Sequence, residues 1–360
     1  MLKKALSGLG VIMLAVSMTA CDTATNSSQG DQGSSSPKTE APAADTGSKA
    51  EKVTFNLSTP DPDTASITIA ANEFAKLVNE KSKGSIEVKV FPSGSLYGGD
   101  PSAAVKQLGA GSLDMLALST SLYANFEPKF SAISIPYLFD DREQFMSYLN
   151  GEPGQQLLQS IDSFNIEGLG YWARNFRQIT NSKGPIQEPS DLEGVRLRVP
   201  NNPLWVEFFK ETGAVTTPMA FGEVYNALQL KTIDGQENPA EIPMNAKFYE
   251  VQKYLTVSNH MADSWVIGIN KDKFNKLAPE QQQALREATK EIQEWALDYD
   301  QKQENEAIEF LKGKGMEVNT LTPENHQKFV DISKQLYPKF KDLVKDEAFF
   351  NTTLKFVGKE

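Results

Sequence analysis

The chain has 360 residues, of which 23% are charged and 39% are hydrophobic, and its formal net charge is -11 at pH 7. This acidic balance excludes the basic footprint of a protein that binds nucleic acid through its phosphates. The length is more than one typical domain needs and favours two lobes after processing.

The first twenty residues have the pattern of an export signal. Lys3 and Lys4 form a positive start, residues 9–16 are apolar but too few to span a bilayer, and Met18-Thr19-Ala20 precede Cys21. This stretch resembles a bacterial lipobox, which predicts a lipoprotein signal peptide over residues 1–20 and lipid attachment at Cys21. A free thiol beside a conventional cleavage site is the alternative. Cys21 is the only cysteine, so no disulfide can form within the chain.

Residues 21–52 are rich in Ser, Gly, Thr, Pro and Ala and show no apolar periodicity. Such a composition cannot bury a core, so the segment is predicted to be a flexible tether. A lipid at Cys21 and this tether together predict a protein outside the cytoplasm, in the periplasm or at the cell surface, that stays attached to the membrane.

Strand and helix patterns alternate beyond the tether. Residues 53–57 alternate as a strand, apolar residues recur at helical spacing up to Gly84, and residues 86–90 alternate again. This βαβ unit predicts a parallel sheet. The alternation continues with a helix over 103–108 ended by Gly109 and with strands over 113–118, 168–172 and 195–199. The chain is therefore predicted to be a doubly wound α/β protein, with ligands bound beyond the carboxyl ends of the strands.

Towards the C-terminus the pattern becomes almost entirely helical. Pro279 suits the first position of a helix, and apolar residues recur among many charges over residues 281–311. Thr322-Pro323 opens another helix. We expect these helices to be scaffold and to carry no ligand chemistry.

The strand over residues 195–199 carries two arginines on one face. In Val195-Arg196-Leu197-Arg198-Val199 apolar and cationic residues alternate, and Pro200 ends the strand. A guanidinium at a strand end in a cleft offers two parallel N–H donors to a carboxylate, which a lysine cannot do. The alternative for either arginine is an ordinary surface charge.

Seven short motifs in a fixed order surround and follow Arg198. They are Leu197-Arg198-Val199-Pro200, Gly213-Ala214, Pro218-Met219-Ala220-Phe221, Glu223-Val224-Tyr225, Ala227-Leu228-Gln229, Asp234-Gly235-Gln236-Glu237-Asn238-Pro239 and Phe248-Tyr249-Glu250-Val251-Gln252-Lys253-Tyr254. Together they resemble the signature of DctP-type solute-binding proteins, the extracytoplasmic receptors of TRAP transporters. Seven motifs in order are far more specific than any one of them.

The resemblance implies a two-lobed periplasmic-binding-protein-like fold with a hinge and a long C-terminal helix that spans both lobes. Residues 53–174 with 264–303 would form the first lobe, and residues 175–263 with 304–360 the second. The chain would cross between the lobes near residues 173–174 and 260–263. A ligand that contacts both lobes would close the hinge.

The same resemblance implies a set of ligand-binding residues. Arg198 matches the arginine that clamps the ligand carboxylate, and Arg177 lies where the family often has a second cationic contact. Asn238 matches an amide contact to the same carboxylate, its alternative being a turn-forming Asn before Pro. Phe221 matches an aromatic wall, its alternative being core packing. Ser119 stands where sialic-acid binders carry a glutamate, which makes sialic acid a less suitable ligand.

The implied function is delivery of a small organic acid, a sugar acid or a dicarboxylate, to TRAP membrane subunits. The motif block looks closest to sugar-acid receptors, although two arginines would also suit a dicarboxylate. The implied protein is monomeric and is not an enzyme, and it has no cofactor, metal or nucleic-acid partner. An input protein for a membrane sensor kinase is an alternative that the sequence leaves open.

An exported enzyme is the other alternative, and it lacks recognisable catalytic parts. The chain has two histidines, His260 and His326, and neither HExxH nor GxSxG occurs. His260 is expected to be structural. Two acidic pairs, Asp61 with Asp63 and Asp140 with Asp141, could act as acid and base or bind a metal, but their polar, turn-rich surroundings favour solvated loop carboxylates.

Overall fold

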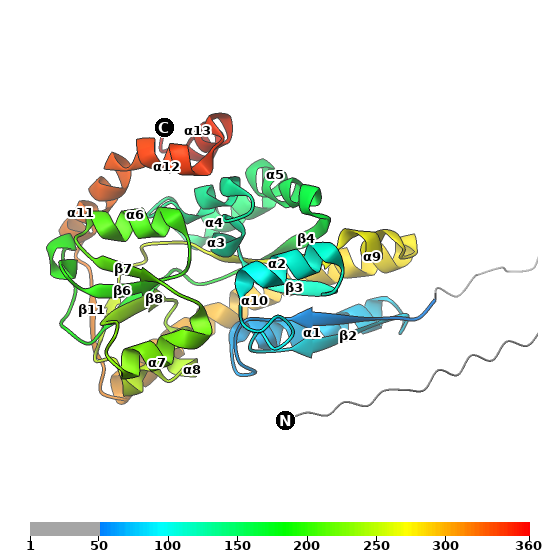
Figure 1. The fold of residues 1–360 in the computed structure, drawn as a ribbon, viewed down its shortest axis with the longest axis horizontal. Helices are drawn as coiled ribbons and strands as arrows, with labels where there is room; N and C mark the ends of the chain where they lie inside the picture. Colours follow the sequence, from blue (N-terminus) through cyan, green and yellow to red (C-terminus); the bar gives the residue numbers. More distant parts are fainter. Residues whose placement is uncertain (1–50) are drawn as a thin grey trace, which may run out of the picture. The chain divides into compact units, whose positions relative to one another are not determined.

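The computed structural model describes residues 51–360 (Figure 1). The predicted signal peptide, Cys21 and the tether up to residue 50 lie outside the described residues. Over the part of the chain that is described, none of the helices combines the length and the apolar character that a membrane crossing requires.

The strands form two separate sheets. The first has the order β2-β1-β3-β10-β4 and the second the order β11-β9-β5-β8-β6-β7. The strands of the first sheet are β1 (Val53–Ser58), β2 (Ile86–Phe91), β3 (Met115–Ser119), β4 (Ile166–Ala173) and β10 (Ser264–Asn270). Those of the second are β5 (Gln178–Asn181), β6 (Arg196–Val199), β7 (Val215–Pro218), β8 (Gly235–Asn238), β9 (Tyr254–Val257) and β11 (Glu317–Thr320).

The parallel pairing predicted from the βαβ unit is present, since β1 runs parallel to β2 and to β3. Both sheets are nevertheless mixed. β10 runs antiparallel to β3 and to β4, and β5 runs antiparallel to β8 and to β9. The cause lies in the crossings. β3 and β4 finish at the same end of the first sheet, and the chain returns to that end to begin β10. Trp265 of β10 pairs with Ser119 of β3 and with Trp172 of β4. A strand that starts where its neighbours end must run antiparallel to them.

Helices cover both sheets (Figure 1). Their bounds are α1 (Ser66–Lys81), α2 (Pro101–Ala110), α3 (Thr120–Tyr123), α4 (Arg142–Asn150), α5 (Glu152–Ser160), α6 (Pro203–Glu211), α7 (Val224–Gln229), α8 (Glu241–Asn245), α9 (Lys271–Asn275), α10 (Pro279–Gly313), α11 (Pro323–Gln335), α12 (Tyr337–Val344) and α13 (Glu347–Phe356). Short 3-10 turns occur at η1 (Pro128–Ser134), η2 (Ile161–Phe164), η3 (Pro189–Leu192), η4 (Phe221–Glu223) and η5 (Phe248–Glu250).

The end of α2 differs from its prediction. Gly109 lies inside this helix, and the left-handed residue that ends it is Gly111, with a φ of 78°. Gly109 is needed for another reason: a Cβ at this position would collide with the carbonyl oxygen of Phe164. The helix therefore contains two glycines with different roles, close approach for the first and capping for the second.

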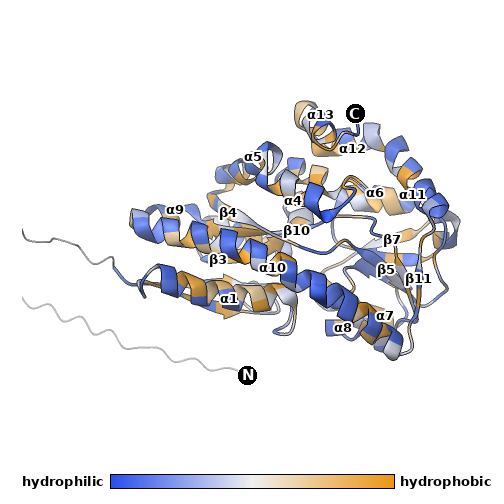
Figure 2. Ribbon diagram, turned by 180° about the vertical axis from the view of Figure 1, so that it is seen from behind, coloured by the Kyte–Doolittle hydropathy of each residue, from blue (hydrophilic) through white to orange (hydrophobic). Residues whose placement is uncertain are grey.

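The long helix α10 spans both lobes, as expected. Its first half packs Leu285, Ala288 and Ile292 into the core beneath the first sheet. Its second half packs Ala307 and Leu311 against residues of the second sheet. Figure 2 shows it running from the side of α1 and α9 to the side of α7 and α8.

Two short segments connect the sheets and run side by side. One links β4 to β5 and the other links β9 to β10. The Arg174 amide donates to the Asp263 carbonyl (3.3 Å) and the Arg177 amide to the Met261 carbonyl (3.0 Å). The helices α12 and α13 contact η1 and α13 also contacts α5, so the C-terminal segment joins parts assigned by prediction to different lobes. The residue bounds of the lobes stay a prediction.

Candidate functional site

A cavity of about 350 Å³ lies where strands of both sheets end. All five residues predicted to bind ligand contribute to its lining: Ser119 at the end of β3, Arg177 in the first crossing, Arg198 on β6, Phe221 on η4 and Asn238 at the end of β8. Strand order brings them together, because β6 and β8 are parallel neighbours and β5 follows Arg177 directly. Their role as ligand contacts stays a prediction.

Arg198 is a buried cation with no carboxylate partner among the described residues. Its guanidinium donates from Nε and Nη2 to the carbonyl oxygen of Met219, at 3.2 and 2.7 Å, and the residue is 4% exposed. Burial lowers the pKa of Arg198 to about 10. The side chain is thus still charged at neutral pH while most of its hydration has been removed.

Arg196, two residues earlier on the same face, shows the alternative that the sequence left open. Its side chain is half-exposed and binds Asp234 through Nη2 to Oδ1, at 2.6 Å, and through Nε to Oδ2, at 2.9 Å. The Arg196 hydrogen bonds hold the pKa of Asp234 at about 2, against the opposing effect of burial. One strand face therefore carries a half-exposed arginine paired with a carboxylate and, at its inner end, a buried arginine without such a partner.

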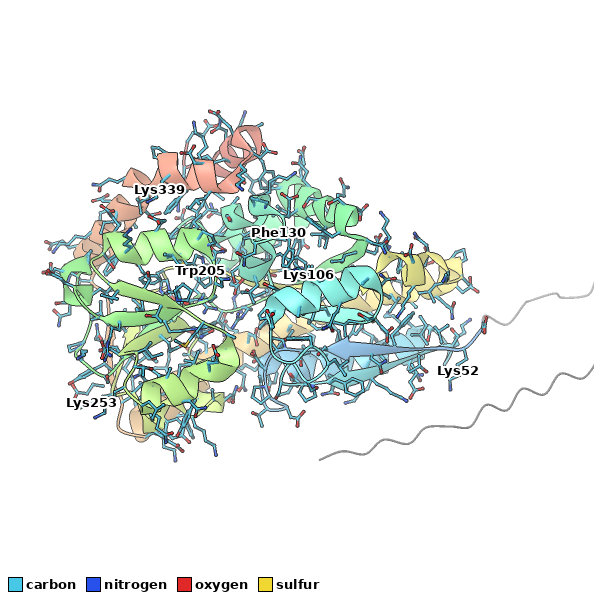
Figure 3. The ribbon with its side chains drawn as sticks, in the orientation of Figure 1. Lys52, Lys106, Phe130, Trp205, Lys253 and Lys339 are labelled. Atoms are coloured by element: carbon cyan, nitrogen blue, oxygen red, sulfur yellow. The ribbon has the colours of Figure 1, made fainter. Side chains whose placement is uncertain are left out.

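The Nε and Nη2 donors of Arg177 are engaged by its own neighbours. It binds Glu237 through Nε to Oε2 (2.5 Å) and Nη2 to Oε1 (3.0 Å), and Nη2 also donates to Asn238 Oδ1 (2.9 Å). Its guanidinium lies 4.7 Å from the ring centroid of Trp205, which Figure 3 labels beneath α6. Burial acts to lower the pKa of Arg177, but the carboxylates of Glu237 and Asp263 outweigh it and the pKa is raised.

Asp263 connects the other half of the site. Arg174 donates to its Oδ2 at 3.0 Å and stacks over Trp265, 4.2 Å from the ring centroid. Ser119 donates to the same carboxylate at 2.7 and 2.8 Å, and Thr120 adds a bond of 2.8 Å. The Ser119 hydroxyl is therefore held by Asp263, and the carboxylate fixes two strand ends relative to the returning chain.

His260 has a structural environment, in line with expectation. It is buried, with Nδ1 2.8 Å from Ser258 Oγ and Nε2 3.3 Å from Glu237 Oε2. Burial lowers its pKa. The imidazole supports the Glu237 carboxylate that in turn holds Arg177, so it acts on the cavity only through other residues.

Asn238 and Phe221 complete the predicted set. The Asn238 amide donates to Gln236 Oε1 at 2.6 Å, and its oxygen accepts from Arg177. Phe221 is only half-buried: its ring packs on Phe248, 6.1 Å between centroids, while it also faces the cavity. Both alternatives for Phe221, cavity wall and packing, thus apply to the same ring.

Asp61 was wrongly interpreted from the sequence as a solvated loop carboxylate. It follows β1, lines the cavity and is 4% exposed, and its Oδ2 has no hydrogen-bond partner among the described residues. Burial raises the pKa of Asp61, while the charges of three arginines, Arg174, Arg177 and Arg198, act against that rise. Asp63, by contrast, is exposed as expected. Local sequence could not distinguish the two, because the walls around Asp61 come from distant segments.

The comparison with protein families covers most of the described chain. The family described as "Bacterial extracellular solute-binding protein, family 7", or DctP, matches residues 57–343. The chain belongs to this family.

Among residues 51–360 there is no group of three or more His, Cys, Asp or Glu side chains that could hold a metal.

Named DctP relatives include receptors for different acids. The 2,3-diketo-L-gulonate-binding periplasmic protein YiaO of Escherichia coli is 34% identical over 271 residues, which are 75% of this chain and 81% of the relative. The C4-dicarboxylate-binding protein DctB of Bacillus subtilis is 33% identical over 276 residues, 76% of this chain and 78% of the relative. Family members are receptors, so the expectation that this DctP protein is not an enzyme is confirmed.

A solved DctP structure has the same two-lobed fold. The sugar acid binding protein DctPAm of Advenella mimigardefordensis, in complex with galactonate, superposes with a TM-score of 0.82 at 30% identity, over 86% of this chain and 99% of that protein. The predicted α/β two-lobed class and the membership of the TRAP receptor family are thus confirmed.

Proposed function

We propose that the protein is an extracytoplasmic receptor that clamps the carboxylate of one small organic acid with Arg198 and delivers the acid to TRAP membrane subunits. The single observation that carries the proposal is the buried Arg198 guanidinium, which faces a cavity between two sheets and has no carboxylate partner among residues 51–360. A ligand carboxylate would supply the missing counter-charge.

The other cavity arginines would have supporting roles. Arg177 donates from Nε and Nη2 to Glu237 and Asn238. Its Nη1 makes only one long contact, 3.4 Å to Asp263, and could also donate to a ligand oxygen. Asn238, held by Gln236 and Arg177, would present its amide to the same carboxylate. Phe221 and Ser119 would then form walls of the cavity on opposite sheets.

Hinge closure would link binding to delivery. The cavity is lined from both sheets, so a bound acid would contact both lobes and favour the closed arrangement. Lipid attachment at Cys21, a flexible tether, a monomeric state and contact with permease subunits complete the proposal. Relatives that bind 2,3-diketo-L-gulonate, C4-dicarboxylates and galactonate support the organic-acid class.

The test is calorimetric titration of the purified protein with a panel of sugar acids and dicarboxylates. Removing one partner of a buried charge pair costs about 3 to 5 kcal/mol, so Arg198→Ala is expected to weaken binding by a few hundred-fold or more. Arg198→Lys should fail nearly as badly, because a lysine cannot donate two parallel bonds.

Arg196→Ala is the matched control, because Arg196 lies on the same strand face but pairs with Asp234, and neither residue lines the cavity. This control should bind within about twofold of the original protein. An Arg198→Lys variant that binds within threefold of the original would refute the two-bond clamp, and a folded protein that binds no organic acid at all would refute the receptor proposal.

A further inference from the structure

Two of the three arginines that line the cavity form salt bridges with carboxylates of the protein. Arg177 is neutralised by Glu237, and Arg174 by Asp263. Arg198 is the arginine among the described lining residues that has no salt bridge to a carboxylate. A buried site neutralises as many ligand charges as it has unpaired charges of opposite sign, since each further buried charge would lose its hydration without compensation. Arg198 can therefore neutralise one ligand carboxylate.

Asp61 adds a carboxylate of its own to this cavity. It comes from the loop after β1, on the first sheet, whereas Arg198 comes from β6 of the second. Its main chain is held in place: the Asp61 carbonyl accepts from the Ser93 amide at 2.9 Å and from Thr68 Oγ1 at 3.2 Å. The side chain is buried, with Oδ2 unpartnered among residues 51–360.

A buried, unpartnered carboxylate oxygen at a ligand cavity is an acceptor without a donor. Leaving such a group unpaired is costly, and a ligand hydroxyl would pair it. A second ligand carboxylate in the same part of the cavity has no hydrogen to donate to that oxygen and would be repelled by ionised Asp61. The field of Asp61 also helps raise the pKa of Tyr97, after the larger effect of burial, so that lining phenol would remain a neutral donor.

We propose that Asp61 selects hydroxylated monocarboxylates, such as aldonates, over dicarboxylates, by accepting a hydrogen bond from a ligand hydroxyl and repelling a second carboxylate. The inference rests on the proposed receptor function and narrows its ligand class. It distinguishes this chain from a relative named for C4-dicarboxylates and groups it with a structure that holds galactonate.

The test uses pairs of acids that differ only at the end remote from the clamped carboxylate. Galactonate with galactarate, gluconate with glucarate, threonate with tartrate, and 4-hydroxybutanoate with succinate each exchange a terminal CH₂OH for a carboxylate. Calorimetric titration should show that the original protein binds the monocarboxylate of its best pair at least tenfold tighter. Like-charge contact at an interface costs several kcal/mol, so about tenfold is a conservative expectation.

Asp61→Asn removes the negative charge and keeps the shape. It should lower the preference for the monocarboxylate to about threefold or less, mainly by strengthening dicarboxylate binding. Asp63→Asn, in the same loop but exposed, is the matched control and should keep the original preference. If Asp61→Asn does not fold, Asp61→Ser allows the same comparison. The preference of the original protein for the monocarboxylate can be measured without any variant.

The outcomes separate the two proposals. A dicarboxylate bound as tightly as its monocarboxylate partner by the original protein would overturn the role of Asp61 and leave the receptor proposal standing. So would an unchanged preference in both Asp61 variants. A folded protein that binds no acid of the panel would overturn the receptor proposal, and this inference with it.

Discussion

Three carboxyl groups buried beside the first crossing make protein stability depend on pH. Glu241 on α8 and Asp300 and Glu304 on α10 each have an oxygen with no partner among the described residues. Burial and the charge of Glu241 raise the pKa of Asp300 to about 7 and that of Glu304 to about 8. Arg142 opposes these shifts only partly. The perturbation we consider is Asp300→Asn, which removes one of the three ionisable groups.

The direction follows from proton binding. The ordinary pKa values are 3.8 for Asp and 4.5 for Glu, so above pH 4.5 the unfolded chain releases protons that the folded chain still holds. The contribution of these carboxyl groups to folding stability is therefore largest at the acid end of this window and falls as pH rises towards 8, whereas buried His260, with its lowered pKa, acts in the opposite direction below its ordinary pKa of 6.5. Each retained proton contributes a slope of about 1.4 kcal/mol per pH unit. One proton between pH 5.5 and 7 therefore accounts for on the order of 2 kcal/mol.

The assay is urea unfolding of the ligand-free protein at pH 5.5, 6.5, 7.5 and 8. The original protein should lose stability across this series. Asp300→Asn should show a shallower slope and should be more stable than the original protein at pH 8, because an amide resembles the protonated acid. Asp298→Asn, exposed on the same helix, should keep the original slope. Stability that stays constant or increases up to pH 8, or equal slopes for the two variants, would refute the reasoning.

Two further predictions concern stability without ligand. Arg198→Met removes a buried charge that lacks a counter-ion and keeps a similar side-chain volume. It should raise the melting temperature of the ligand-free protein by a few degrees and abolish the stabilisation by organic acids. A lower melting temperature would contradict the unpaired state of Arg198. Gly109→Ala should lower the free energy of unfolding by about 2 kcal/mol, because the added Cβ collides with the Phe164 carbonyl. The control is Gly184→Ala, whose added Cβ meets no atom within 4 Å and which should change the free energy of unfolding by less than about 0.5 kcal/mol. Equal effects of the two variants in urea unfolding would count against the collision.

The sequence predicted those features that local pattern or a family signature determines. Residues 53–57 and 86–90 formed strands, the long helix lay where its apolar spacing placed it, and five dispersed residues met at one cavity. Strand direction could not be read in this way. Periodicity is the same in parallel and antiparallel strands, and the reversal of β10 follows from a crossing that no local pattern records.

The site residues that could be recognised by residue type were predicted correctly as part of the cavity. Those whose role depends on burial were misjudged. Arg196 and Arg198 have equivalent places in an alternating strand, yet Arg196 is half-exposed and pairs with Asp234, whereas Arg198 is buried. Asp61 and Asp63 share one loop and differ in the same way. Burial is produced by segments that are distant in sequence, so it cannot be inferred from immediate neighbours.

The central position of β10 in the first sheet has a consequence for how the chain folds. β3 and β4, its two neighbours, precede it by about 145 and 91 residues. A chain that emerges from its N-terminus must therefore reach residue 270 before β3 and β4 can pair with their shared neighbour, and residue 313 before α10 covers the sheet. Pairings over such separations form slowly, and open edges favour association with other chains. A chain that stops short of β10 would leave one edge of β3 unpaired and β4 without any partner strand, so its first sheet would be incomplete.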